Sequence, residues 1–133
     1  MARAVAIVGA SRDRTKYGNK AVRAHRQLGD QVYPVHPKEK EIEGLPVFPD
    51  LRAIPGQIDR VLLYVAPAVG ITLLEQIAER LPVELYLSPG SESPELVRRA
   101  RELGLDPIEA CPILAIEIDP ASLDPDPAGG GRA

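Results

Sequence analysis

The residues best suited to hold an anion lie in one loop near the start of the chain. Residues 4–8 are five small or branched apolar residues in a row, a pattern typical of a strand buried on both faces. Gly9 follows, where the backbone can turn sharply or let a ligand approach closely. Hydroxyl and cationic side chains come next: Ser11, Arg12, Arg14, Thr15 and Lys16. Because a helical pattern begins near Gly18, the stretch is typical of the entry to a nucleotide-binding α/β domain.

The rest of the chain alternates strands with helices. Apolar runs predict strands over 31–35, 60–65 and 83–87 and a short one from 106, and helical spacing predicts helices over 19–28, about 69–80 and 94–103. Ser93 is the expected cap of the last helix, with Pro94 at its first position. The segment 42–49 is expected to loop, with at most a short edge strand at 47–48. The alternation predicts an α/β fold with a doubly wound, mostly parallel sheet in three α/β/α layers.

Composition narrows the class of protein. The 133 residues predict one domain over 1–118, followed from 119 to 133 by a Pro- and Gly-rich flexible tail. A net charge of −3 gives no general attraction to nucleic acid, and no apolar run is long enough to span a membrane. The single cysteine excludes an internal disulfide and fits a cytoplasmic protein. Frequent prolines and few thermolabile residues fit a heat-tolerant source or a GC-rich genome.

The nature of the nucleotide is suggested by the ends of three strands, which parallel sheets bring to one edge. These ends carry Gly9-Ala10-Ser11, His36-Pro37-Lys38 and Ala66-Pro67-Ala68. The glycines of the dinucleotide fingerprint are missing after Gly9. Binders of NAD place a carboxylate after the second strand, whereas Lys38 would attract a phosphorylated ribose. NAD is therefore disfavoured, while NADP and coenzyme A (CoA) stay open.

A family resemblance favours CoA. The chain resembles the CoA-binding domain family, in particular small single-domain bacterial proteins related to the CoA-binding domain of the succinyl-CoA synthetase α subunit. The resemblance spans roughly residues 3 to 118 and rests on residues 5–11, 16–19, 32–38, 44–51, 65–67 and 111–112. It implies a Rossmann-like fold that binds CoA through its adenine, ribose and phosphate end. The histidine that the synthetase phosphorylates lies in a second domain outside the resemblance, so ligase activity is not implied.

The resemblance also implies roles for individual residues. Gly9, Ala10 and Ser11 would approach the phosphates with Lys16 nearby, Pro37 and Lys38 would border the 3′-phosphorylated ribose, and Val65, Ala66 and Pro67 would line the adenine and pantetheine side. Arg12, Tyr17 and His36 complete the candidate binding residues. His36 stands where relatives often have Asn, and Ala110 where the synthetase pattern has Asn before Cys-Pro.

Structural interpretations compete with these roles. Gly9 also fits an ordinary βα turn, Arg12 and Lys16 fit solvated loop charges, and residues 38–41 fit a solvated charge run. His25 is expected to face solvent. Cys111, after a strand and before proline, is expected to be a buried structural thiol rather than a redox group or a partner of CoA in a disulfide.

No catalytic or metal-binding group of residues is predicted. His36 lacks an evident base or nucleophile beside it, the two histidines and one cysteine have no metal-ligand spacing, and Ser88 lacks the spacing of a nucleophile elbow. We therefore expect a cytoplasmic protein that binds CoA or an acyl-CoA without catalysing a reaction, with a protein partner or a homo-oligomer possible. The alternatives are a small NADP-dependent reductase and a partner-docking subunit with a vestigial pocket.

Overall fold

The computed structural model describes residues 3–82, 84–116 and 118–123. Its centre is a five-stranded sheet in the order β2-β1-β5-β6-β7, with every pair of neighbours parallel. The strands are β1 (Ala4–Val8), β2 (Gln31–Val35), β5 (Arg60–Leu63), β6 (Glu84–Leu87) and β7 (Pro107–Glu109). The chain moves outward from β1 to β2 on one side and from β5 to β7 on the other. This order confirms the predicted doubly wound parallel sheet.

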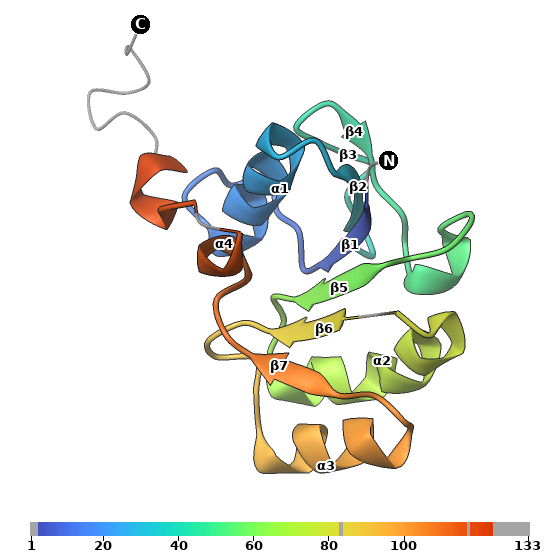
Figure 1. The fold of residues 1–133 in the computed structure, drawn as a ribbon. Coiled ribbons are helices and arrows are strands. Elements are labelled where there is room, and N and C mark those ends of the chain that lie inside the picture. The colour runs from blue at the N-terminus through green and yellow to red at the C-terminus, as the bar shows by residue number, and fades with distance from the viewer. Residues whose placement is uncertain (1–2, 83, 117, 124–133) are drawn as a thin grey trace, which may run out of the picture.

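Three main helices cover the two faces of the sheet (Figure 1). Helices α2 (Pro67–Arg80) and α3 (Pro94–Glu102) pack on one face, and α1 (Tyr17–Gln27) and the short α4 (Pro112–Ala115) pack on the other. Because successive strand residues point to opposite faces, Ala6 and Val8 join the core under α2 and α3, while Val5 and Ile7 join the core under α1. The result is the predicted three-layer arrangement.

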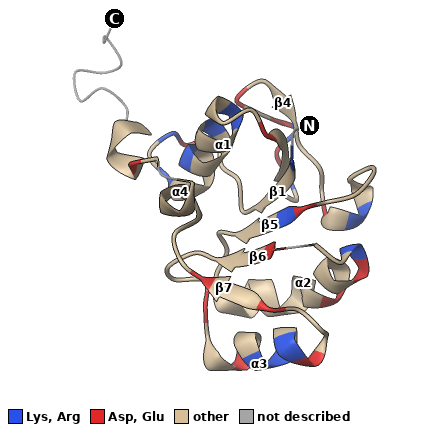
Figure 2. Ribbon diagram, in the orientation of Figure 1, with Lys and Arg blue, Asp and Glu red and all other residues tan. Residues whose placement is uncertain are grey.

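The predicted start of α3 is confirmed in detail. The Ser93 hydroxyl accepts a hydrogen bond from the Leu96 backbone N–H at 3.0 Å, and Pro94 occupies the first turn. At the amino ends of the strands, the start of β5 is blue and the start of β6 is red (Figure 2). These residues are Arg60 and Glu84, and the Arg60 Nε donates to Glu84 Oε1 at 2.7 Å. Charge pairing therefore joins β5 to β6 where the two strands begin.

The segment between β2 and β5 contains more structure than the sequence suggests. A small antiparallel hairpin forms from β3 (Glu41–Ile42) and β4 (Leu45–Pro46), with Glu43 and Gly44 at positive φ in its turn. The edge strand expected at 47–48 is reduced to one bridge between Phe48 and Val35. This bridge draws the following 3-10 helix, η1 (Leu51–Ala53), toward the carboxyl end of β2.

Two other expectations from the sequence are wrong. His25 was expected to face solvent, but it is fully buried and its Nδ1 lies 3.0 Å from the Ala21 carbonyl oxygen. In the segment predicted to form an unstructured tail, Pro120–Leu123 form a second 3-10 helix, η2, in which Leu123 is buried. Apolar packing against α1 explains this turn, because Leu123 joins the same core as Ala21 and Ala24. Residues 124–133 lie outside the described structure.

Candidate functional site

Two glycines, at positions 9 and 18, let the ends of the first loop lie close together. Gly9 follows β1 with φ +88, and a Cβ on it would lie 2.5 Å from the carbonyl oxygen of Tyr64. A Cβ on Gly18, in the first turn of α1, would collide with the carbonyl oxygen of Gly9. Positions 9 and 18 therefore require glycine because strand, loop and helix approach closely there. Any larger side chain at position 9 would push β1 away from β5.

The loop between these glycines is held by hydrogen bonds to its own backbone. Asn19, fully buried at the start of α1, donates from Nδ2 to the Ser11 carbonyl oxygen at 2.9 Å. The Asp13 N–H donates to the Ser11 hydroxyl at 3.0 Å, and the Thr15 N–H and hydroxyl donate to the Asp13 carboxylate. These two bonds lower the pKa of Asp13, so it stays a carboxylate. Since Ser11 accepts rather than donates here, its hydroxyl proton is free for a ligand.

A cavity of about 530 Å³ opens where the connections of β1 and β5 diverge, and we call it the crossover cavity. This is the position at which parallel α/β sheets hold their ligands. Six of the predicted binding residues line it: Gly9, Ser11, Lys16, His36, Pro37 and Val65. Asp50 and Leu51 reach it from the segment drawn in by the bridge at Phe48, and Leu73 and Gln76 reach it from α2.

Two smaller hollows continue from the crossover cavity along the carboxyl ends of the strands. The loop hollow, about 290 Å³, shares Gly9, Lys16 and Val65 with the cavity and adds Tyr17, Ala66 and residues 88–91. The apolar chamber, about 300 Å³, is lined by Tyr17, Tyr64, Ser88, Pro89, Cys111, Leu114 and Pro120. Tyr64 lines all three spaces. The three hollows therefore adjoin one another along the carboxyl ends of the strands.

His36 presents a hydrogen-bond donor to the crossover cavity. The backbone N–H groups of Lys38 and Glu39 both donate to its Nδ1 at 3.0 Å. An Nδ1 that accepts two bonds carries no proton, so the neutral ring carries its proton on Nε2. The ring thereby closes the turn after β2 and serves as a fixed positioning group.

The predicted cations fall into two separate places. Lys16 lines the crossover cavity and the loop hollow, and its charge also contributes to lowering the pKa of nearby Asp13. Arg12 and Lys38 line a different, outer hollow, with Glu39, Glu41 and Glu43 among them. There Arg12 Nε lies 3.5 Å from Glu39 Oε2. Arg12 and Lys38, which follow the cavity-lining residues Ser11 and Pro37, therefore lie at the border of the cavity rather than inside it.

Two other predicted residues lie away from the open space. Ala10 is 1% exposed and packs in the core beneath α1, and Pro67 opens α2 without lining any of these hollows. Sequence reasoning missed Asp50, Tyr64 and Gln76 as lining residues. Asp50 also caps η1, since its carboxylate accepts from the Ala53 N–H at 3.1 Å.

Tyr64 combines a central position with an unusual polar group. Its hydroxyl is buried and has no hydrogen-bond partner among the described residues. Burial raises the pKa of Tyr64 far above its ordinary value, helped by nearby Cys111 and Tyr17, so the hydroxyl keeps its proton. Cys111 is partly exposed instead of buried as expected, because it faces the apolar chamber.

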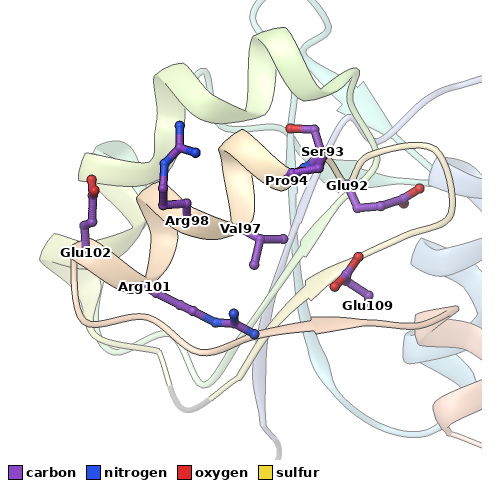
Figure 3. A pocket seen from close by; sticks show the side chains of 8 residues that line it. All are labelled: Glu92, Ser93, Pro94, Val97, Arg98, Arg101, Glu102 and Glu109. Atoms are coloured by element: carbon purple, nitrogen blue, oxygen red, sulfur yellow. The ribbon is translucent and has the colours of Figure 1, made fainter.

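Other features of the described residues do not suggest a second kind of site. No group of three metal-binding side chains occurs among them, and no described helix has the length and apolar character to cross a bilayer. A broad hollow of about 820 Å³ between α3 and β7 is lined by Arg98, Arg101, Glu102 and Glu109 (Figure 3). It shares no residue with the other three hollows and lies away from the carboxyl ends of β1 and β5.

A parallel α/β domain with a cavity at its crossover and a glycine-held loop is a nucleotide-binding type of domain. The family model described as a CoA binding domain matches residues 3–117. The chain therefore belongs to the CoA-binding domain family, which confirms the resemblance seen in the sequence.

Two curated relatives are subunits or forms of ADP-forming acetate–CoA ligase. The II subunit alpha of Pyrococcus furiosus is 33% identical over 75 residues, which cover 55% of this chain and 16% of that protein. Ligase I of Archaeoglobus fulgidus is 38% identical over 61 residues, which cover 46% of this chain and 9% of that protein. The matched segments are thus a small part of each ligase.

Solved structures with the same fold are closer in size. A conserved hypothetical protein from Pyrococcus furiosus has a TM-score of 0.77 and 31% identity, covering 85% of this chain and 98% of that one. A hypothetical protein from Pyrococcus horikoshii OT3 has a TM-score of 0.82 and 27% identity, covering 87% and 82% of the two chains. These similarities confirm the Rossmann-like fold.

Proposed function

We propose that this protein binds CoA along the carboxyl ends of its strands and catalyses no reaction on its own. The observation that carries the proposal is the crossover cavity, which gathers six residues that the sequence had singled out for binding. Membership of the CoA-binding domain family supports the same ligand. Bacterial origin, heat tolerance and cytoplasmic location stay predictions.

The shape and charge of the path fit an extended nucleotide. The adenosine lies in the crossover cavity, where apolar Leu51, Val65 and Leu73 face its ring. The diphosphate crosses the loop between Gly9 and Lys16, where the glycine permits close approach and the lysine supplies charge. The 3′-phosphate projects past Pro37 toward Lys38 in the outer hollow.

The proposal that binding is not accompanied by catalysis rests on the groups in the site. The His36 Nδ1 is occupied by two backbone donors, so it is not available as a base for the Ser11 hydroxyl that lines the same cavity. Two alternatives remain as outcomes of the test: NADP binding by a small reductase, and a vestigial pocket in a partner-docking subunit.

Isothermal titration with CoA, dephospho-CoA, NADP and NAD tests the proposal. We expect CoA to bind most tightly and dephospho-CoA more weakly, because the latter lacks the 3′-phosphate near Lys38. Binding of NADP with no response to CoA would favour the reductase, and no binding of any of the four would favour the docking subunit.

Two lysine variants separate the proposed phosphate contacts. Lys16→Ala should weaken both CoA and dephospho-CoA about tenfold, since it removes a charge-assisted contact to the diphosphate that the two share. Lys38→Ala should weaken CoA alone. Arg98→Ala, which removes a cation from α3, is the matched control and should change neither. Equal affinity of CoA and dephospho-CoA for the unaltered protein would refute the role of Lys38.

A further inference from the structure

The apolar chamber, with a volume of about 300 Å³, is lined mainly by apolar and aromatic side chains. We propose that it holds the acyl group of a short-chain acyl-CoA, so that the physiological ligand is a thioester rather than free CoA. This inference rests on the proposed CoA site and adds the chemical class of the group at its far end.

The lining of the chamber favours an apolar guest. Tyr17, Tyr64, Pro89 and Leu114 present ring and aliphatic carbon to it. The one serine in this lining makes its hydrogen bonds within the protein. The buried Ser88 hydroxyl donates to the Leu63 carbonyl oxygen at 2.7 Å and lies 3.2 Å from the Ser91 hydroxyl. With that hydroxyl occupied, most of the remaining lining offers carbon surface, and the Tyr64 hydroxyl and the Cys111 thiol are polar groups within it.

The rim of the chamber contains two apolar side chains that the fold leaves in water. Tyr17 is 52% exposed and Leu114 is 59% exposed, although both are large and apolar. They come from α1 and α4, far apart in the sequence, and meet at the same opening. An acyl chain between them would remove apolar surface of both protein and ligand from water.

The position of the chamber fits the far end of a CoA molecule. It shares Tyr17, Tyr64, Ser88 and Pro89 with the loop hollow, which in turn opens into the crossover cavity. The path from β1 past β5 and β6 to β7 crosses three strand spacings, about 14 Å at about 4.8 Å each. A ligand anchored by its nucleotide at β1 therefore delivers its sulfur end to the chamber.

Tyr64 stands where the thioester carbonyl would pass. Its hydroxyl is buried and unpartnered among the described residues, and it retains its proton. A buried donor without an acceptor is unfavourable until a partner arrives, so an acceptor such as a carbonyl oxygen is the group that this position favours. The volume of about 300 Å³ lies at the lower limit of small-molecule sites, which restricts the guest to a short chain.

Titration of the full chain with CoA, acetyl-CoA, butyryl-CoA and octanoyl-CoA tests the inference. Each methylene buried between acetyl and butyryl should tighten binding about threefold to fourfold, giving about a tenfold gain. Octanoyl-CoA should show no further gain, because its chain exceeds the chamber.

Substitution at the rim tests whether the gain arises in this chamber. Leu114→Asp should remove the difference in affinity between butyryl-CoA and CoA, because a carboxylate at the rim opposes burial of the acyl chain. The control, Leu81→Asp, alters another exposed leucine that does not line the chamber and should keep the gain. Leu81 has a φ of 45, a conformation that Asp tolerates, so the control is expected to fold.

A second variant tests the carbonyl contact. Tyr64→Phe should weaken butyryl-CoA about threefold to tenfold and leave S-butyl-CoA, which lacks the carbonyl, unchanged. Equal weakening of the two would overturn the carbonyl contact. Tight binding of CoA with a flat acyl series would overturn the acyl chamber and leave the proposed function standing, whereas no binding of CoA at all would overturn the proposed function itself.

Discussion

The two edges of the sheet differ in how their polar groups are satisfied. At the amino ends of the strands, ion pairs and side-chain bonds join neighbouring segments: Arg60 with Glu84, Arg3 with Asp30, and the Asp59 carboxylate with the Ala4 N–H at 2.8 Å. At the carboxyl ends, Lys16 lines the crossover cavity close to Asp13, and the Tyr64 hydroxyl has no hydrogen-bond partner among the described residues.

This difference suggests that the amino edge serves stability and the carboxyl edge serves the proposed binding. The amino edge fixes where the strands begin, so the carboxyl edge can leave polar groups available to a ligand without loss of the fold. The amino edge also has unbonded buried nitrogens, His25 Nε2 and Arg60 Nη1, but neither residue lines the three adjoining hollows. We therefore expect those groups to affect stability, and Lys16 and Tyr64 to affect the proposed binding.

The largest effect is expected at Gly9, where the binding edge meets the core. Gly9→Ala should lower the free energy of unfolding by roughly 3 kcal/mol, because the new Cβ meets the Tyr64 carbonyl carbon at 2.8 Å as well as its oxygen, in a backbone conformation that strains any side chain. Urea denaturation followed by circular dichroism measures the change.

Gly29 provides the matched control at the opposite edge. Its φ of +92 is nearly that of Gly9, but nothing lies within 4 Å of a Cβ built on it. Gly29→Ala should therefore lower the free energy of unfolding by only about 1 kcal/mol, the cost of placing a side chain in this backbone conformation. Equal losses in the two variants would contradict the close approach at Gly9.

A smaller effect is expected from the ion pair at the amino edge. Glu84→Gln should lower stability by about 2 kcal/mol, because Arg60 is 6% exposed and loses its charged acceptor, while CoA binding stays unchanged. Glu79→Gln, which breaks the fully exposed pair with Arg52, should change nothing measurable. A loss of CoA affinity in Glu84→Gln would break the separation between the two edges.

The smallest expected effect is a pH dependence of the free energy of unfolding, which arises from His25. Burial lowers the pKa of His25 below its ordinary 6.5, outweighing the bond to Ala21 and the field of Asp30. The unfolded chain therefore binds more protons as the pH falls below 6.5, and stability present above that pH is lost toward lower pH.

Denaturation between pH 7.5 and 5.5 measures this dependence. The slope should approach, at most, about 1.4 kcal/mol per pH unit at the acid end and flatten in His25→Gln. A steep slope that survives in His25→Gln would assign the effect to other groups.

The sequence predicted the sheet well, for a physical reason. Unbroken apolar runs such as residues 4–8 mark strands buried on both faces, and Gly9 marks the turn that follows. The strand order places the residues after β1, β2 and β5 together, so Gly9, Ser11, His36 and Val65 were identifiable as neighbours.

Long-range packing set the limit of that prediction. Asp50 lines the cavity because the bridge between Phe48 and Val35 brings its segment to the end of β2. No local sequence pattern indicates this bridge. His25 is buried because the surrounding helix positions also face the sheet, although the adjacent Arg26 suggested a solvent-facing side. Lys38 follows the predicted strand end, yet its side chain turns into the outer hollow.

The most direct test of the division between the edges is to map CoA binding by amide chemical shifts in ¹⁵N-labelled protein. Binding at the proposed site predicts shifts concentrated in residues 9–18, 36–38, 64–66 and 88–91, with the amides of His25, Arg60 and Glu84 unchanged. Shifts centred on the amino edge, or on the hollow between α3 and β7, would contradict the account.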